Sequence, residues 1–227
     1  MGKKLIKLKK SLDQNKEYSL IDAISLLKEV SYVKFDETLD IAIHLGIDPR
    51  RSDQIVRGMV ILPEGTGKNV KVAVFCKEER MREAKNSGAD FVDSNNLIRD
   101  IKDGKIEFDI LIATPDMMGI VGEIAQILGP RGLMPNPKFG TVTKEIGDAV
   151  QNAKCGQVEY RTEKSGIIHA GIGKISFSEK ALHNNVCALF NSILKVKPVG
   201  VKGTYLKKMY LSSTMSPSLK VDITTVV

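Results

Sequence analysis

Pro63-Glu64-Gly65-Thr66-Gly67-Lys68 separates two stretches of sequence that differ in their pattern of apolar and polar residues. This change of pattern decides the fold. Before it, Thr38–Ile47 alternates apolar and polar residues with a period of two, which predicts a strand. After it, short apolar segments alternate with helical segments that end near glycine. Such alternation favours a parallel sheet covered by helices, a Rossmann-like three-layer unit. The six residues themselves are typical of a flexible connection.

The segments on either side of this connection suggest two domains. After it, strands are expected at Lys71–Phe75, Phe91–Val92 and Phe108–Ala113, and helices at Glu78–Ser87, Asn95–Lys102, Asp116–Leu128 and Lys144–Ala153. Strands then return at Gly156–Tyr160, Ile167–Ala170, Thr204–Ser213 and Leu219–Val226, with an amphipathic helix at Glu179–Leu194. We therefore expect α/β and α+β structure: a split α+β domain built from both termini (residues 1–67 and 160–227), and an inserted Rossmann-like three-layer α/β domain (68–159).

Two local signals refine the first part of the split domain. Ser19 precedes apolar residues at helical spacing, so we expect it to cap a helix. Thr38–Ile47 and Ile55–Leu62 both have strand character and are joined by the polar, basic turn Asp48–Asp53. We expect these two strands to form an antiparallel pair.

Positive charge is concentrated outside the inserted domain. The 227 residues carry a formal net charge of +7, yet residues 68–159 contain 13 basic and 14 acidic side chains. Residues 180–221 contain seven lysines and no acid, and the first ten residues contain five lysines and no acid. A surface without acids suits an anionic partner, and a nucleic-acid backbone is the partner we favour.

Cysteine and histidine usage argues against a disulfide framework, a metal site and a catalytic centre. The cysteines form no CxxC pair, and the histidines lack metal-ligand or nucleophile spacing; these residues are Cys76, Cys155, Cys187, His44, His169 and His183. No signal-peptide pattern and no membrane-spanning apolar run is present. We expect a cytoplasmic protein that is not an enzyme and needs no metal or cofactor.

Gly65-Thr66-Gly67-Lys68 resembles part of a phosphate-binding loop but lacks the other members of that motif. The motif needs glycine where Leu62 stands and a hydroxyl residue where Asn69 stands. A nucleotide-binding enzyme or sensor that uses the inserted domain, near this loop or near Thr114–Asp116, is the alternative function. A third interpretation is a basic protein that binds RNA without specificity.

The turn Ser212–Ser218 holds the groups best suited to RNA. Hydroxyls at Ser212, Ser213 and Thr214 can bond to phosphates, 2′-OH groups and base edges. Met215 and Phe35 could lie against a base or ribose, although composition alone favours a core position for each.

Six segments have residue patterns that identify a protein family more specifically than overall composition does. They are Lys34–Thr38, Leu45–Gln54, Val56–Gly58, Ala113–Asp116, Leu128–Lys138 and Ser213–Met215. In this order, over nearly the whole chain, they resemble the bacterial large-subunit ribosomal protein L-one family, the universal protein of the ribosomal stalk. The resemblance implies binding of large-subunit ribosomal RNA (rRNA) at the mobile stalk, help in releasing exit-site tRNA, and repression of the protein's own operon through its mRNA. It also implies association with the ribosome, and we expect a monomer when the protein is free of it.

The resemblance also assigns site residues. Its main RNA surface falls on Lys34, Phe35, Thr38, Thr214, Met215 and Ser216, to which we add Ser212. The second domain of the family makes weaker RNA contacts, which we assign to Arg131 and Lys138. Ser216 departs from the family, which has glycine there. We expect the turn to survive, with the Ser216 hydroxyl facing RNA or solvent.

Overall fold

The computed structural model describes residues 16–92, 94–201 and 203–226, so the basic first ten residues and Lys202 lie outside the described residues. The chain forms two compact units. One contains the chain up to Gly67 and from Gln157 onward, and it is called the split unit below. The other, Lys68–Gly156, is called the inserted unit. The mixture of α and β structure expected from the sequence is confirmed.

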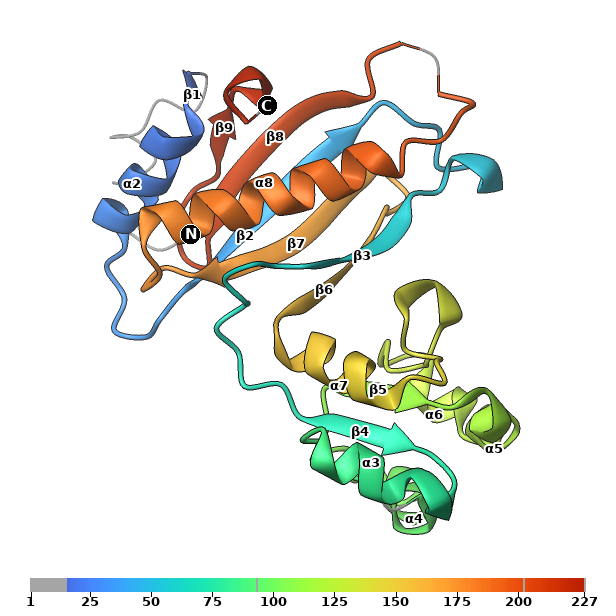
Figure 1. Ribbon diagram of the computed structural model, residues 1–227. Helices are drawn as coiled ribbons and strands as arrows, with labels where there is room; N and C mark the ends of the chain where they lie inside the picture. The colour runs from blue at the N-terminus through green and yellow to red at the C-terminus, as the bar shows by residue number, and fades with distance from the viewer. Residues whose placement is uncertain (1–15, 93, 202, 227) are drawn as a thin grey trace. The chain divides into compact units, whose positions relative to one another are not determined.

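A five-stranded sheet is the frame of the split unit, with the order β1-β9-β8-β2-β7 (Figure 1). Its strands are β1 (Glu17–Tyr18), β2 (Thr38–Leu45), β7 (Ile167–Lys174), β8 (Leu206–Ser213) and β9 (Leu219–Val221). Among the described strands of this sheet, only β1 and β9 pair in parallel. Strand β2 lies between β7 and β8, which both come from the other end of the chain. The early and late segments of the sequence therefore share one hydrogen-bonded sheet.

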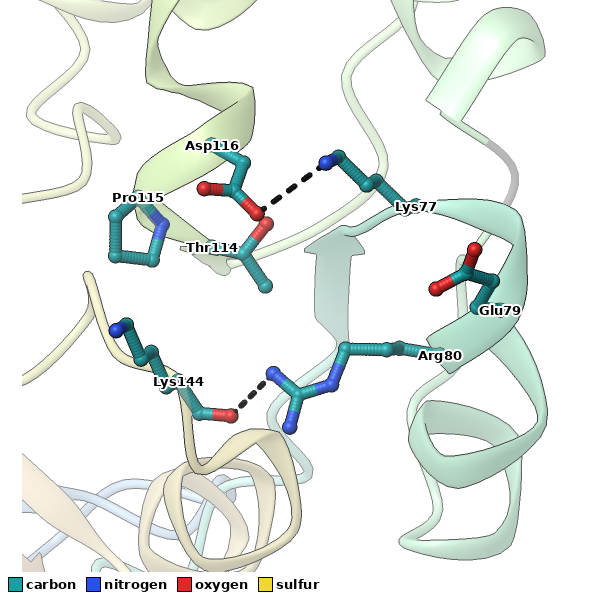
Figure 2. A pocket seen from close by; sticks show the side chains of 7 residues that line it. All are labelled: Lys77, Glu79, Arg80, Thr114, Pro115, Asp116 and Lys144. Atoms are coloured by element: carbon teal, nitrogen blue, oxygen red, sulfur yellow. Dashed lines mark hydrogen bonds and ion pairs between the residues drawn. The ribbon is translucent and has the colours of Figure 1, made fainter.

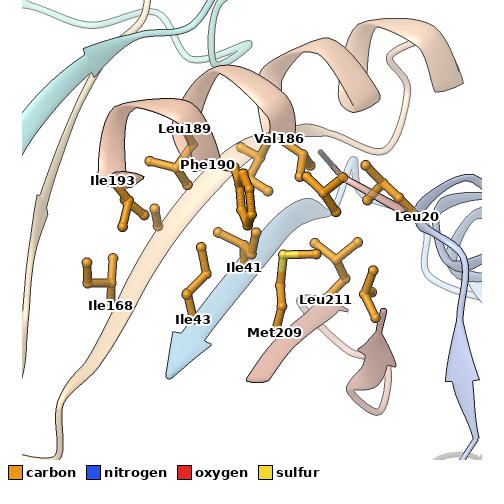
Figure 3. Close-up of a cluster of buried hydrophobic side chains, with 14 of the residues drawn as sticks. Leu20, Ile41, Ile43, Ile168, Val186, Leu189, Phe190, Ile193, Met209 and Leu211 are labelled. Atoms are coloured by element: carbon orange, nitrogen blue, oxygen red, sulfur yellow. The ribbon is translucent and has the colours of Figure 1, made fainter. Parts of the chain in front are cut away.

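Helices α2 (Leu20–Val30) and α8 (Glu179–Lys195) pack their apolar sides against one face of this sheet (Figures 1 and 3). Alternate residues of β2, such as Ile41 and Ile43, are buried against α8 residues such as Phe190. Burial of each such side chain contributes about 1.5–3 kcal/mol to folding. Ser19 caps α2 as expected, because its hydroxyl accepts a 3.2 Å hydrogen bond from the Asp22 amide.

The expected pairing of Thr38–Ile47 with Ile55–Leu62 is wrong. Strand β3 (Arg57–Ile61) pairs antiparallel with β6 (Gln157–Arg161) instead. Both edges of β2 are already occupied by β7 and β8, so β2 offers no free edge. Thr162 extends the β3–β6 ribbon, because its amide and its hydroxyl both donate to the carbonyl of Val56.

The inserted unit is built on the parallel strands β4 (Val72–Phe75) and β5 (Ile110–Ala113), which single bridges extend at Phe91 and Val142. Its helical segments are η2 (Glu78–Arg80), α3 (Met81–Asn86), α4 (Ser94–Lys102), η3 (Pro115–Met117), α5 (Met118–Glu123), α6 (Ala125–Leu128), η4 (Pro137–Phe139) and α7 (Ile146–Lys154). Alternate residues of β4 enter two different cores: Ala73 packs with α4, α5 and α6, whereas Val74 packs with α3 and α7. Helices therefore pack on both faces of the parallel pair.

Several expected elements are shorter than the sequence suggested, and the expected helix Glu78–Ser87 is divided into η2 and α3. The expected helix Asp116–Leu128 is divided into η3, α5 and α6, and Gly119 and Gly122 lie inside this segment, where they weaken a continuous helix. The last expected strand stops at Val221, because the Asp222 side chain accepts from the Thr224 amide and caps the short helix η5 (Ile223–Thr225). In the part of the chain that the structure describes, no helix is long and apolar enough to cross a membrane.

Candidate nucleic-acid interface

Two segments that are far apart in sequence meet at one end of the five-stranded sheet. The register of β2 and β8 places Leu39 opposite Ser213, which brings Thr38 next to Thr214. The Thr38 amide donates a 3.2 Å hydrogen bond to the Thr214 hydroxyl oxygen. The pairing of the sheet therefore joins Thr38 and Thr214, and Phe35 and Met215 lie close to these two residues along the chain.

The turn after β8 is closed by its own hydrogen bonds. The Ser216 amide donates to the Ser213 carbonyl at 3.3 Å, and the Ser213 amide donates to the Ser216 hydroxyl at 2.8 Å. The same hydroxyl donates to the Pro217 carbonyl at 3.1 Å. Among the described residues, only glycines have positive φ angles, so the turn needs no left-handed residue at Ser216. The expected outward orientation of this hydroxyl is wrong, because it is engaged within the turn.

Two large apolar side chains of the site are exposed to solvent. Phe35 is 54% exposed and Met215 is 46% exposed. The core position that composition favours is therefore wrong for both residues. An exposed aromatic ring and an exposed thioether provide flat, polarisable surface on which nucleic-acid bases can stack. Lys34, directly before the phenylalanine, is exposed as well.

Glu37 lies beneath this surface and was missed by the sequence analysis. It is 2% exposed, and its carboxylate accepts hydrogen bonds from the Met215 amide at 2.8 Å and from the Ser31 hydroxyl at 2.7 Å. Its main-chain carbonyl accepts from the Ile175 amide at 2.9 Å. The only local signal was an acid next to threonine at the start of a strand, which does not reveal a partner 178 positions away.

Lys174 at the end of β7 is a second residue that the sequence did not single out. Its ammonium group donates to the Thr38 hydroxyl at 3.0 Å and to the Asp36 carbonyl at 3.3 Å. Asp36 in turn accepts hydrogen bonds from the amide and hydroxyl of Ser176. The loop that carries Phe35 is therefore attached to β7 and to the segment that follows it.

Residues 180–221, called the acid-free run below, contain lysines that differ in their surroundings. Lys207 and Lys208 are exposed on β8. Lys220 pairs with Glu17, and the hydrogen bond that its ammonium group donates to this carboxylate raises the pKa of the lysine. Ser212 is half-buried and lies opposite Asp40, so an acid borders this part of the sheet although the acid-free run contains none.

Arg131 and Lys138 belong to the inserted unit. Both side chains are exposed, and they flank a loop that ends in η4. The Asn136 side chain accepts from the Lys138 amide at 2.9 Å, which caps η4. Their exposure leaves both cations free to approach a phosphate group.

The nucleotide alternative would place its ligand at the ends of β4 and β5. A hollow of about 300 Å³ lies there, lined by Lys77, Glu79, Arg80, Thr114, Pro115, Asp116 and Lys144 (Figure 2). Lys77 pairs with Asp116 at 3.5 Å, and both side chains are largely exposed, so this ion pair contributes little to the stability of the fold. Two carboxylates among three cations leave a mixed field that favours phosphate weakly. Among the described residues that line the hollow, Thr114 has the one buried side-chain oxygen without a hydrogen-bond partner.

Basic residues, a closed hydroxyl-rich turn and exposed stacking groups together are typical of an RNA-binding protein. The family described as ribosomal protein L1p/L10e matches residues 27–217, and the chain belongs to this family. The chain is 59% identical to the large ribosomal subunit protein uL1 of Rickettsia akari over 225 residues, which cover 99% of this chain and 94% of that protein. It is 58% identical, with the same coverage, to the uL1 proteins of Rickettsia conorii and Rickettsia prowazekii.

Membership of this family decides the question of catalysis. The relatives are named as ribosomal proteins, and the family is not one of enzymes. The expectation that the chain is not an enzyme is therefore confirmed, and the nucleotide-dependent alternative has no support among the relatives.

Proposed function

We propose that this protein is a constituent of the large ribosomal subunit that binds rRNA at the mobile stalk through the split unit. The observation that carries the proposal is the junction of Thr38 with Thr214, which places exposed Phe35 and Met215 on the same end of one sheet. Its relatives are named large ribosomal subunit proteins. As a ribosomal component, the protein would act in the cytoplasm.

Each group of the site has a distinct task in this proposal. Lys34 attracts phosphates without regard to sequence. Backbone and hydroxyl groups of the turn at Thr214 bond to the sugar edge of a folded RNA, where the 2′-OH distinguishes RNA from DNA. Phe35 and Met215 cover an unstacked base or ribose. Arg131 and Lys138 of the inserted unit make auxiliary phosphate contacts.

We propose two further roles, and the first of them uses the same surface. An RNA site in the protein's own operon mRNA that imitates the stalk rRNA would bind the same turn, so the free protein would repress its own translation only when rRNA is saturated. On the ribosome, the protein would assist the release of tRNA from the exit site. We propose that it is a monomer when free, with the split domain and a Rossmann-like inserted domain as its two parts.

A competition experiment tests the proposal. Labelled stalk rRNA bound to the protein is challenged with unlabelled stalk rRNA, own-operon leader mRNA and scrambled RNA of equal length at several salt concentrations. We expect the first two competitors to displace the label at least about 100-fold more effectively than the scrambled RNA, and affinity to fall steeply with salt. Equal displacement by all three would indicate a non-specific basic protein and contradict the proposal.

A further inference from the structure

We propose that Glu37 is a positioning residue for RNA recognition: its buried carboxylate holds the Met215 amide and so fixes the exposed turn in its binding conformation. The inference rests on the proposed function, because it concerns the same RNA surface. An acidic residue such as Glu37 is unexpected directly beneath a proposed RNA-binding surface. A carboxylate near an RNA site repels phosphates, so its presence calls for a reason other than charge attraction.

The reason lies in the acceptor oxygens of the carboxylate. One oxygen accepts from the Met215 amide at 2.8 Å and the other accepts from the Ser31 hydroxyl at 2.7 Å. Ser31 is the C-cap residue of α2, so the carboxylate connects the end of this helix with the turn after β8. Among the described residues, no lysine or arginine pairs with Glu37. An ionised acceptor makes a stronger hydrogen bond to an amide than a neutral one does.

The main chain of Glu37 is held as firmly as its side chain. Its carbonyl accepts from Ile175 after β7, and the adjacent Thr38 amide donates to the Thr214 hydroxyl. Glu37 therefore stands where α2, the end of β7 and the turn meet. Its side chain is 2% exposed, whereas Met215 is 46% exposed. Glu37 thus cannot touch RNA in this conformation and acts through the turn.

The turn itself offers few other restraints on Met215. Its internal hydrogen bonds join Ser213 with Ser216 and leave the Met215 amide without a partner inside the turn. Loss of the Glu37 acceptor would leave this amide unpaired and allow the peptide between Thr214 and Met215 to rotate. Both residues of that peptide are assigned to the RNA surface, so rotation would misplace them together.

Substitutions that separate shape from hydrogen bonding test this role. Glu37→Met has nearly the size of glutamate but offers the Met215 amide only a weakly accepting thioether in place of the carboxylate, and it fills the buried site better than Glu37→Ala does. Glu37→Gln is the matched control, since its side-chain oxygen still accepts from that amide and its NH₂ group can donate to Ser31. We expect Glu37→Met to weaken binding of the stalk rRNA about 10-fold or more, and Glu37→Gln to weaken it less than about 3-fold. In ¹⁵N-resolved NMR spectra, the Met215 amide resonance should move strongly in the first variant and little in the second.

A double-mutant cycle distinguishes positioning from a general effect on the fold. In the background Thr214→Ala/Met215→Ala, Glu37→Met should cost less than about 2-fold, because the side chains through which it acts are missing. An equal loss in both backgrounds would overturn the inference. Unchanged binding by Glu37→Met, while Thr214→Ala/Met215→Ala is weakened, would overturn the inference and leave the proposed function standing. Unchanged binding by all these variants would overturn the proposed function and the inference with it.

Discussion

The amide of Thr38 donates a 3.2 Å hydrogen bond to the side-chain oxygen of Thr214, a residue 176 positions further along the chain. The same oxygen lies 3.5 Å from the Thr38 carbonyl, to which its hydroxyl donates. One threonine side chain thus joins the start of β2 to the turn after β8. Together with the pairing of β2 with β8, this contact positions the two halves of the proposed RNA surface.

Removal of this side-chain oxygen should weaken RNA recognition. Thr214→Ala leaves the Thr38 amide without its acceptor and removes a hydroxyl from the RNA surface, so we expect stalk rRNA affinity to fall about 10-fold. Thr214→Ser keeps the hydroxyl and should bind within about 3-fold of the wild type. Fluorescence anisotropy with labelled RNA measures both affinities, and circular dichroism checks the fold. Wild-type affinity in Thr214→Ala would remove this residue from the site.

Stacking by the two exposed apolar side chains can be tested separately from stability. Phe35→Ala and Met215→Ala should each reduce stalk rRNA affinity about 5-fold to 100-fold, which is the range for loss of one stacking contact. Because both side chains are about half exposed, the midpoint of thermal unfolding should change by only a few degrees. Phe35→Tyr keeps an aromatic face and is the control. A large loss of thermal stability without a change in affinity would show that these residues belong to the core.

Lys34 should contribute through phosphate attraction alone. Lys34→Ala should lower the slope of log affinity against log salt by about 1, and should weaken specific and scrambled RNA alike. Lys180→Ala is the matched control, because this exposed lysine lies in the first turn of α8 and has no assigned RNA role. Titrations at four or more salt concentrations give both slopes. Equal slopes for wild type and Lys34→Ala would exclude a phosphate contact at this position.

Asn185 should be a strong determinant of stability at the connection that leaves the split unit. Its side chain is fully buried, accepts from the Glu64 amide, and donates to the carbonyls of Gly65 and Ile172. Asn185→Leu leaves three main-chain groups unpaired, and we expect the free energy of unfolding to fall by on the order of 3 kcal/mol. Asn184→Leu, at the exposed neighbour on α8, should change it by less than about 0.5 kcal/mol. Urea denaturation of both variants measures the difference, and similar stabilities would refute the role of Asn185.

Local patterns in the sequence predicted local structure well. The alternation in Thr38–Ile47 predicted β2, and the serine before an apolar helical set predicted the cap at Ser19. Pairing between strands was harder to predict, because local patterns do not show which edges of a strand are already paired. The hairpin expected between β2 and β3 failed for this reason.

Contacts between distant segments were also the part of the candidate site that could not be predicted from residues alone. Residues alone could not connect Thr38 with Thr214, and only the resemblance to a known family brought them together. Composition placed Phe35 and Met215 in the core, although both are exposed, because an apolar side chain at a binding surface looks like a core residue in sequence. Glu37 was missed since its role depends on an amide 178 positions away.

Footprinting of the large-subunit rRNA tests the central claim most directly. Hydroxyl-radical cleavage of stalk rRNA, with and without protein, reports which sugars the protein covers. We expect protection of a compact set of stalk nucleotides by the wild-type protein, and loss of that protection with Thr214→Ala/Met215→Ala at a concentration where Asn184→Leu still protects. Protection that is absent, or that is identical for the wild type and the turn variant, would contradict the account.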